Sequence, residues 1–166
     1  MAVRNIEEVH LSSRTKEKAE KLAEATQQKY GVKTKTYDQA DEAMEAADII
    51  VTATNASEPV YSHTLHPGVH LNAVGSFKPD MQELPSESMM IANKIVVEST
   101  EAAMEETSDL KVPHEEGILT HNMLYGELGD IVSGKKAGRE DEKEVTLFKS
   151  VGLAIVDIVV AQYFYK

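Results

Sequence analysis

Small and polar residues follow the apolar runs of this sequence at the places where strands would end. They are residues 12–15 (Ser-Ser-Arg-Thr), 52–55 (Thr-Ala-Thr-Asn), 74–76 (Val-Gly-Ser) and Ser99. Ligands of an open parallel sheet bind outside the carboxyl ends of its strands, and small side chains let a flat ligand approach the backbone. Turns and helix caps use the same residue types, so an ordinary turn is the better explanation of any one segment alone. Their coincidence after successive strands favours a ligand-binding edge.

The segment Ser13-Arg14-Thr15 has the composition of a phosphate site. In dinucleotide-binding domains the end of the second strand meets the adenosine ribose, where an acidic residue favours NAD and an arginine beside hydroxyls favours NADP. This segment has no Asp or Glu. We therefore expect NAD(P) as the cofactor, with NADP slightly preferred. A helix N-terminus with solvated cations explains the same residues equally well.

The candidates for proton transfer and metal binding are few. Asp80 in "GSFKPDM" lies just beyond an expected strand end, where a carboxylate could shuttle protons, although it could equally cap the "MQEL" segment. His63 and His66 are three residues apart without an evident third ligand, so we expect no metal site. The sequence contains no P-loop, nucleophile elbow or complete GxGxxG motif. Asp80 is therefore the one candidate for catalysis that the sequence offers.

Composition limits the classes of partner. The chain has 166 residues, no cysteine and a formal net charge of -11. This charge disfavours nucleic acid, which requires cationic contacts, and anionic membranes. The absence of cysteine excludes disulfides, and the longest apolar run is too short to span a membrane. We expect a cytoplasmic protein that binds neither nucleic acid nor membrane.

The order of strand and helix patterns predicts an α/β fold with a parallel sheet and flanking helices. A helix after the first strand should end at Gly31, with Ala19, Leu22, Ala23, Thr26 and Tyr30 on one face, opposite the solvent side. The continuous apolar run in "DIIVTATN" is typical of a strand buried on both faces. We expect one domain over residues 1–166. The expected strands are 9–12, 32–37, 48–55, 66–76 and 93–99, with a strand or loop at 144–152 and an apolar helix at 152–166.

Five segments together resemble the ornithine cyclodeaminase/mu-crystallin family. They are "SRTKEKAEKLAE", "ADIIVTATNASEPV", "HLNAVGSFKPDMQEL", "YGELGDIVSGKKAGR" and "TLFKSVGLAIVDIVVA", and they follow one another along essentially the whole chain. The resemblance implies a Rossmann domain of a homodimeric NAD(P)-dependent enzyme that acts on an amino acid or an imine. It also implies an N-terminal substrate domain that these residues do not include.

The resemblance assigns roles to individual residues. Ser13, Arg14 and Thr15 match the adenosine-ribose or 2′-phosphate site, and Ser150 and Val151 match the segment that touches the nicotinamide. Phe77 stands where ornithine cyclodeaminases carry a catalytic Asp, which favours the ketimine-reductase side of the family. The segment along the cofactor and the nicotinamide side are matched by Thr52, Ala53, Thr54, Asn55, Val74 and Gly75.

The resemblance also implies that the first Rossmann strand and its GxGxxA turn are missing from this sequence. We expect the "VHLSS" and "DIIVTAT" strands to pair directly, or a second copy to fill the gap, because unpaired strands associate. The apolar C-terminal helix would likewise favour a homo-oligomer, a dimer in the simplest case. The isolated chain should then be inactive, and the alternative is a non-catalytic oligomeric or binding protein derived from the family.

Overall fold

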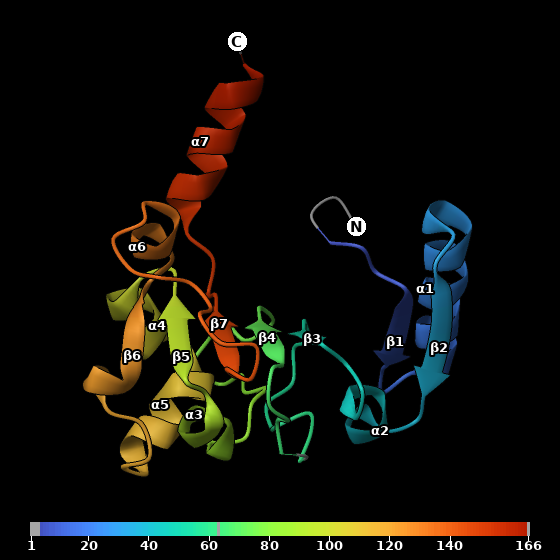
Figure 1. The fold of residues 1–166 in the computed structure, drawn as a ribbon, viewed down its shortest axis with the longest axis horizontal. Helices are drawn as coiled ribbons and strands as arrows, with labels where there is room; N and C mark the ends of the chain where they lie inside the picture. Colours follow the sequence, from blue (N-terminus) through green and yellow to red (C-terminus); the bar gives the residue numbers. More distant parts are fainter. Residues whose placement is uncertain (1–3, 63, 166) are drawn as a thin grey trace. The chain divides into compact units, whose positions relative to one another are not determined.

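The computed structural model describes residues 4–62 and 64–165. These residues form two compact units, one of residues 4–48 with 61–62 and one of residues 49–60 with 64–165 (Figure 1). His63, one of the two spaced histidines, lies outside the described residues.

The first unit is a two-stranded parallel sheet with two helices. Strand β1 pairs with β2 in parallel, and α1 ends at Gly31, whose left-handed backbone (φ 68°) lets its N–H donate to the Gln27 carbonyl. The elements are β1 (Glu8–Ser12), α1 (Lys16–Tyr30), β2 (Lys33–Tyr37) and α2 (Ala40–Met44).

The covered face of α1 is narrower than the sequence predicts. Ala19 and Ala23 are buried, as expected, whereas Leu22 and Tyr30 are more than half exposed. A sheet of two strands covers only a narrow stripe of a helix, and the two alanines fill that stripe. The prediction of a wider apolar face was therefore wrong.

The second unit is built on a five-stranded parallel sheet in the order β3-β4-β7-β5-β6. The last strand in the sequence thus lies at the centre, between β4 and β5. The strands are β3 (Ile49–Thr52), β4 (His70–Ala73), β5 (Lys94–Val97), β6 (Leu124–Glu127) and β7 (Thr146–Lys149). This confirms the expected α/β class with parallel sheets and flanking helices.

Helices flank this sheet and enclose the main core (Figure 1). They are α3 (Glu87–Ile91), α4 (Thr100–Glu106), α5 (Ser108–Glu115), the 3-10 helix η1 (His121–Met123) and α6 (Leu128–Val132). Helix α7 (Ala154–Phe164) instead extends away from the sheet. The core side chains that are almost fully buried include Val69, Leu71, Leu84, Met89, Ile95, Val97, Leu110, Leu119 and Leu147. Burial of these apolar side chains is the main term that stabilises the unit.

Strand β3 is an outer strand of its sheet, and two expectations about it were wrong. Ile50 and Thr52 are buried, but Ile49 and Val51 are 41% and 60% exposed, so one face of the predicted two-sided strand is uncovered. Direct pairing of "VHLSS" with "DIIVTAT" is also not formed. Among the described residues β1 pairs with β2 and β3 pairs with β4, which leaves two separate sheets.

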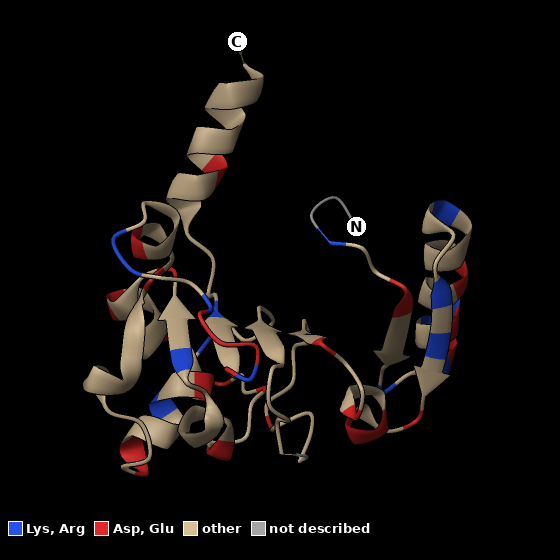
Figure 2. Ribbon diagram, in the orientation of Figure 1, with Lys and Arg blue, Asp and Glu red and all other residues tan. Residues whose placement is uncertain are grey.

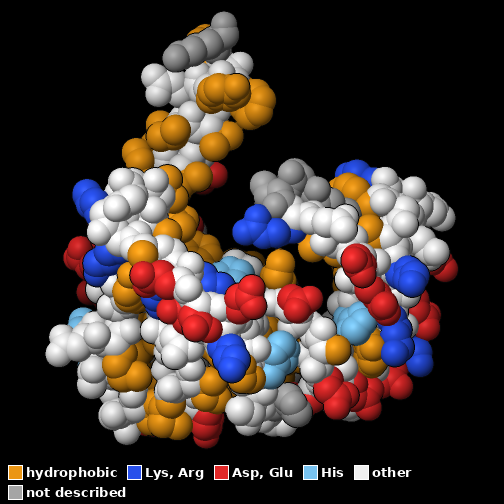
Figure 3. Space-filling view, in the orientation of Figure 1, with side chains coloured by type: hydrophobic (Ala, Val, Ile, Leu, Met, Phe, Trp, Pro, Cys, Tyr) orange, Lys and Arg blue, Asp and Glu red, His pale blue; other side chains and the backbone are white. Residues whose placement is uncertain are grey.

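Helix α7 is apolar and exposed around its circumference. Asp157 is its only charged residue (Figure 2), and apolar side chains are exposed along its length (Figure 3). They include Ile155, Val156, Ile158, Val159, Val160, Tyr163 and Phe164. Within the described ranges, no helix combines the length and apolar character needed to cross a membrane. The cytoplasmic location stays a prediction.

Candidate functional site

The strands of the second unit end at one level, which brings the predicted residues of this unit to one edge. Thr52 is the register partner of Ala73, and Ala73 is the register partner of Lys149. Hydrogen bonds continue this alignment, because Val74 N–H donates to Thr52 O (2.9 Å) and Ser150 N–H donates to Ala73 O (3.0 Å). We call residues 53–55, 74–76 and 150–151 the carboxyl edge.

A buried carboxylate lies behind the carboxyl edge. Glu83 is fully buried, and it accepts hydrogen bonds from the Thr52 hydroxyl (2.9 Å), Gly75 N–H (2.9 Å) and Ser76 N–H (3.2 Å). It also accepts from the Thr54 N–H. The ends of β3 and β4 are therefore joined through one side chain. Sequence reasoning missed Glu83, because "MQEL" was interpreted as a capped segment and no local pattern marks a buried glutamate.

A buried ion pair extends this network to β7. Lys149 Nζ lies 2.8 Å from Asp109 Oδ2, and both side chains are fully buried. Lys149 Nζ also donates to the Ser76 carbonyl (2.7 Å), while Asp109 Oδ1 accepts from the backbone N–H groups of Glu83 (2.6 Å) and Leu84 (2.9 Å). Glu83, Asp109 and Lys149 form what we call the buried charge cluster.

The predicted residues of this edge divide into exposed and buried ones. Ala53, Thr54, Asn55 and Val74 are exposed, whereas Thr52 and Gly75 are buried. A side chain at Gly75 would overlap the Thr54 backbone and the Glu83 carboxylate. A ligand at this edge would meet the exposed residues, with the buried pair fixing their backbone.

The segment after β7 is held by a second carboxylate that sequence reasoning missed. Glu98 follows β5, and its Oε2 accepts from the Ser150 hydroxyl (2.7 Å) and Gly152 N–H (3.1 Å). Ser150 and Val151 are half-buried. At this strand end, sequence reasoning singled out only the next residue, Ser99. Ser99 caps α4 by accepting a hydrogen bond from Ala102 N–H (3.4 Å).

Ser13, Arg14 and Thr15 belong to the other compact unit, where they form an exposed turn between β1 and α1. The Ser13 hydroxyl accepts from Thr15 N–H (3.4 Å). Thr15 occupies the N-cap position of α1, but its side chain makes no capping hydrogen bond to the helix. A pure capping explanation of Thr15 would require such a hydrogen bond, and the structure does not form it.

The remaining candidates lie on the surface. Asp80 is exposed in a turn after the carboxyl edge, and Phe77 is half-exposed. His66 Nδ1 lies 3.1 Å from the Pro67 carbonyl. Within residues 4–62 and 64–165, no group of three or more His, Asp or Glu side chains is arranged to hold a metal ion. The roles of Asp80 and of the carboxyl edge stay predictions.

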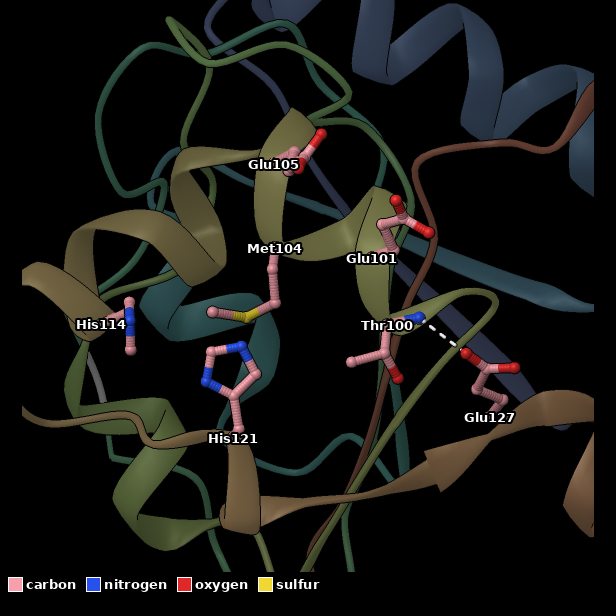
Figure 4. A pocket seen from close by; sticks show the side chains of 7 residues that line it. All are labelled: Thr100, Glu101, Met104, Glu105, His114, His121 and Glu127. Carbon is pink, nitrogen blue, oxygen red and sulfur yellow. Dashed lines mark hydrogen bonds between the residues drawn. The ribbon is translucent and has the colours of Figure 1, made fainter.

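An open pocket of about 570 Å³ lies elsewhere in the second unit, beside α4, α5, η1 and the end of β6 (Figure 4). Its His114 and His121 rings are perpendicular, with centroids 5.2 Å apart, and the Glu127 carboxylate accepts from Thr100 N–H (2.9 Å). None of the predicted site residues lines it. The full lining is Thr100, Glu101, Met104, Glu105, His114, His121 and Glu127.

A second charged cluster lies at the opposite, amino end of the strands. Lys94 at the start of β5 is buried and pairs with Glu140 (2.7 Å) and Glu144 (3.4 Å). The Glu140 hydrogen bond raises the pKa of Lys94 above its ordinary 10.5. The Glu140 backbone N–H, which donates to Glu144, together with Lys94, holds the pKa of Glu144 below its ordinary 4.5.

Known proteins are similar to this chain in sequence and in fold. The model of the ornithine cyclodeaminase/mu-crystallin family matches residues 1–166. A Δ1-pyrroline-2-carboxylate reductase from Bacillus cereus is 58% identical over 165 residues, which cover 99% of this chain and 51% of that protein. The chain thus spans about half the length of the curated relatives it matches.

Solved structures agree with the sequence comparison. The Δ1-pyrroline-2-carboxylate reductase of Thermococcus litoralis in complex with NADH and L-proline has a TM-score of 0.93 at 41% identity, over 97% of this chain and 50% of that one. An archaeal alanine dehydrogenase dimer with bound NAD has a TM-score of 0.89 at 32% identity, over 97% and 49%. The resemblance of the five segments is confirmed, and the chain belongs to the ornithine cyclodeaminase/mu-crystallin family.

Proposed function

We propose that this chain is the NAD(P)-binding portion of an oxidoreductase that interconverts an amino acid and its imine, of the ketimine-reductase type. The observation that carries the proposal is the carboxyl edge, where small exposed residues after β3 and β4 sit on a backbone fixed by Glu83. The likeness to a reductase structure that holds NADH and L-proline supports it. NAD(P)H would supply the hydride.

The residues present fit the cofactor in part. The exposed backbone at Ala53–Asn55 and Val74 is open to a flat ring and its ribose, and Ser150 and Val151 continue the same edge. The 166 residues contain no GxGxxG turn for the pyrophosphate. We therefore infer that these residues alone hold the nucleotide weakly and do not catalyse, since pyrophosphate and substrate contacts must come from elsewhere. Asp80 stays the weak candidate for proton transfer.

Nucleotide titration of the 166-residue chain, followed by amide NMR shifts, tests this proposal. Millimolar NADH should shift the amides of Ala53, Thr54, Asn55, Val74 and Val151. Shifts confined to the pocket at His114 and His121, or none at all, would contradict the assignment of the carboxyl edge. Submicromolar affinity would contradict the inference that essential contacts are missing.

The preference for NADP rests on Arg14 and is tested separately. Replacement Arg14→Ala should weaken NADPH binding and leave NADH binding unchanged, because the guanidinium would contact only the 2′-phosphate. Lys18→Ala, an exposed cation on α1, is the matched control for loss of charge. A wild-type chain that prefers NADH would refute the assignment.

The alternative, a non-catalytic oligomeric protein, is supported by the lack of a GxGxxG turn in these 166 residues. Both proposals predict an oligomer. Helix α7 exposes apolar side chains on all sides, and such a surface marks an interface. The alanine dehydrogenase relative was solved as a dimer. We propose that this chain is a homodimer as well. A chain that forms dimers but binds neither NADH nor NADPH would favour the alternative.

A further inference from the structure

We propose that Glu83 is a positioning residue for the nucleotide, acting by holding the ends of β3 and β4 in one fixed geometry. The inference rests on the proposed function, because it gives Glu83 a role toward the ligand of the carboxyl edge. Glu83 itself is fully buried and does not reach that ligand. It acts through the backbone of Thr54, Gly75 and Ser76.

The contacts of Glu83 span both strand ends. Oε2 accepts from the Thr52 hydroxyl at 2.9 Å on β3 and from Gly75 N–H at 2.9 Å after β4. Oε1 accepts from Thr54 N–H. The exposed Ala53 lies between the anchored residues Thr52 and Thr54. The exposed Val74 directly precedes the anchored Gly75. Any movement of the carboxylate would displace the surface that a ring or ribose must contact.

The chemistry of the site requires a carboxylate and not an amide. All four partners are N–H or O–H donors, and an ionised carboxylate is acceptor-only, with about four lone-pair positions. A glutamine would turn one NH₂ group toward donors and leave at least one of them without an acceptor. Hydrogen bonds to a charged acceptor are also about twice as strong as neutral ones.

The Glu83 backbone is itself fixed from the other side. Asp109 accepts from the N–H groups of Glu83 and Leu84, and Lys149 bridges Asp109 to the Ser76 carbonyl. Lys149 immediately precedes Ser150 of the carboxyl edge. The buried charge cluster thus ties three strand ends together, although burying charges is costly. A role in fixing the three strand ends explains why charged side chains occupy buried positions that apolar side chains could fill.

The experiment compares Glu83→Gln with Glu144→Gln in the 166-residue chain. Glu144 is the control, because it too accepts a backbone hydrogen bond, but it lies at the amino ends of the strands, where it pairs with Lys94. Glu83→Gln should raise the exchange rates of the Thr54, Gly75 and Ser76 amides by about tenfold or more, since each loses a charged acceptor. It should weaken NADH binding by about tenfold.

The control and a milder variant separate positioning from general stability. Glu144→Gln should lower the Tm with no change in those amides or in NADH binding. Thr52→Val removes one hydrogen-bond donor to Glu83 and replaces Glu83→Gln in the test if that variant does not fold. It should raise the same amide exchange rates and weaken NADH binding, each by less than Glu83→Gln. Equal losses of NADH affinity in both glutamine variants at matched Tm, or unchanged amide exchange in Glu83→Gln, would overturn the role of Glu83.

Failure of the proposed function is distinguishable from failure of this inference. If the wild-type chain does not bind NADH, the proposed cofactor function of the lone chain fails. Amide exchange at Thr54, Gly75 and Ser76 then still decides whether Glu83 fixes the two strand ends. Faster amide exchange in Glu83→Gln than in the wild type supports the role of Glu83 in fixing the strand ends. Exchange rates equal to those of the wild type overturn that role.

Discussion

The position of Gly75 could be predicted from the sequence as part of the carboxyl edge, but its packing could not. Its small size after an apolar run predicted an edge open to a ligand. In the structure Gly75 is buried, and the space where a Cβ would stand is filled by the Thr54 backbone and the Glu83 carboxylate. The residue type was informative, but its partner lies eight positions away in a segment with no periodic signal, so the physical reason was not predictable.

Replacement of Gly75 by alanine should therefore be costly. The added Cβ would overlap backbone atoms that cannot rotate away, and overpacking of this kind costs about 1–3 kcal/mol. We expect Gly75→Ala to lower the free energy of unfolding in urea by about that amount. Gly129→Ala in α6 is the control, because nothing lies within 4 Å of its Cβ position. A helical glycine changed to alanine should gain about 0.5–1 kcal/mol. Equal stability of both variants would contradict the packing argument.

Glu144 gives a pH dependence with a defined sign. Its pKa in the folded protein lies below the ordinary 4.5, so the folded state binds fewer protons than the unfolded state near that pH. Its contribution to stability is fully present above about pH 5 and is lost as the pH falls through the folded pKa. Urea unfolding between pH 6 and about pH 3 should show a smaller acid-dependent loss in Glu144→Gln than in the wild type. Identical profiles would contradict the lowered pKa of Glu144 in the folded protein.

Among the elements, β7 was the least predictable. The "EVTLFKSVG" segment could be a strand or a loop, and its four-residue strand lies at the centre of the sheet between β4 and β5. The position depends on contacts across more than fifty residues of sequence. The presence of helix α1 and its end at Gly31 were predictable, because both depend on local signals, although its covered face was not. Residues 110–139, with glycines at 117, 126, 129, 134 and 138, have no comparably strong pattern and favour irregular structure. That expectation was wrong for β6 and α6, which form within this stretch.

The end of β7 should be sensitive to loss of its buried charge. Lys149→Met keeps the volume but leaves Asp109 without its cation, and breaking a buried pair on one side costs about 3–5 kcal/mol. We expect a loss of that order in equilibrium urea unfolding. Adding Asp109→Asn to Lys149→Met should recover part of the loss, because the unpaired charge is removed. A single variant as stable as wild type would show that the pair has no structural role.

At the scale of the whole molecule, the sequence predicted the class of fold and the family but not the division into two compact units. Class and family depend on motifs and periodicity that each segment carries alone. The division depends on which strands pair, and β1 and β3 do not. The candidate site shows the same limit. Its exposed small residues were predicted, whereas Glu83, Asp109, Lys149 and Glu98, which hold them, were not, because buried polar partners are set by packing.

The exposed surface of α7 leads to the last prediction, which concerns assembly. Full burial of each aliphatic side chain is worth about 1.5–3 kcal/mol, and Ile155 and Ile158 are both about 60% exposed. We expect the wild-type chain to sediment as a dimer at micromolar concentration, and the Ile155→Glu, Ile158→Glu variant to sediment as a monomer. The control is Leu22→Glu with Tyr30→Glu, which adds the same charge at exposed apolar positions of α1 and should leave the dimer intact. A wild-type monomer would remove α7 as an interface, and a dimer that survives the α7 variant would place the interface on another surface.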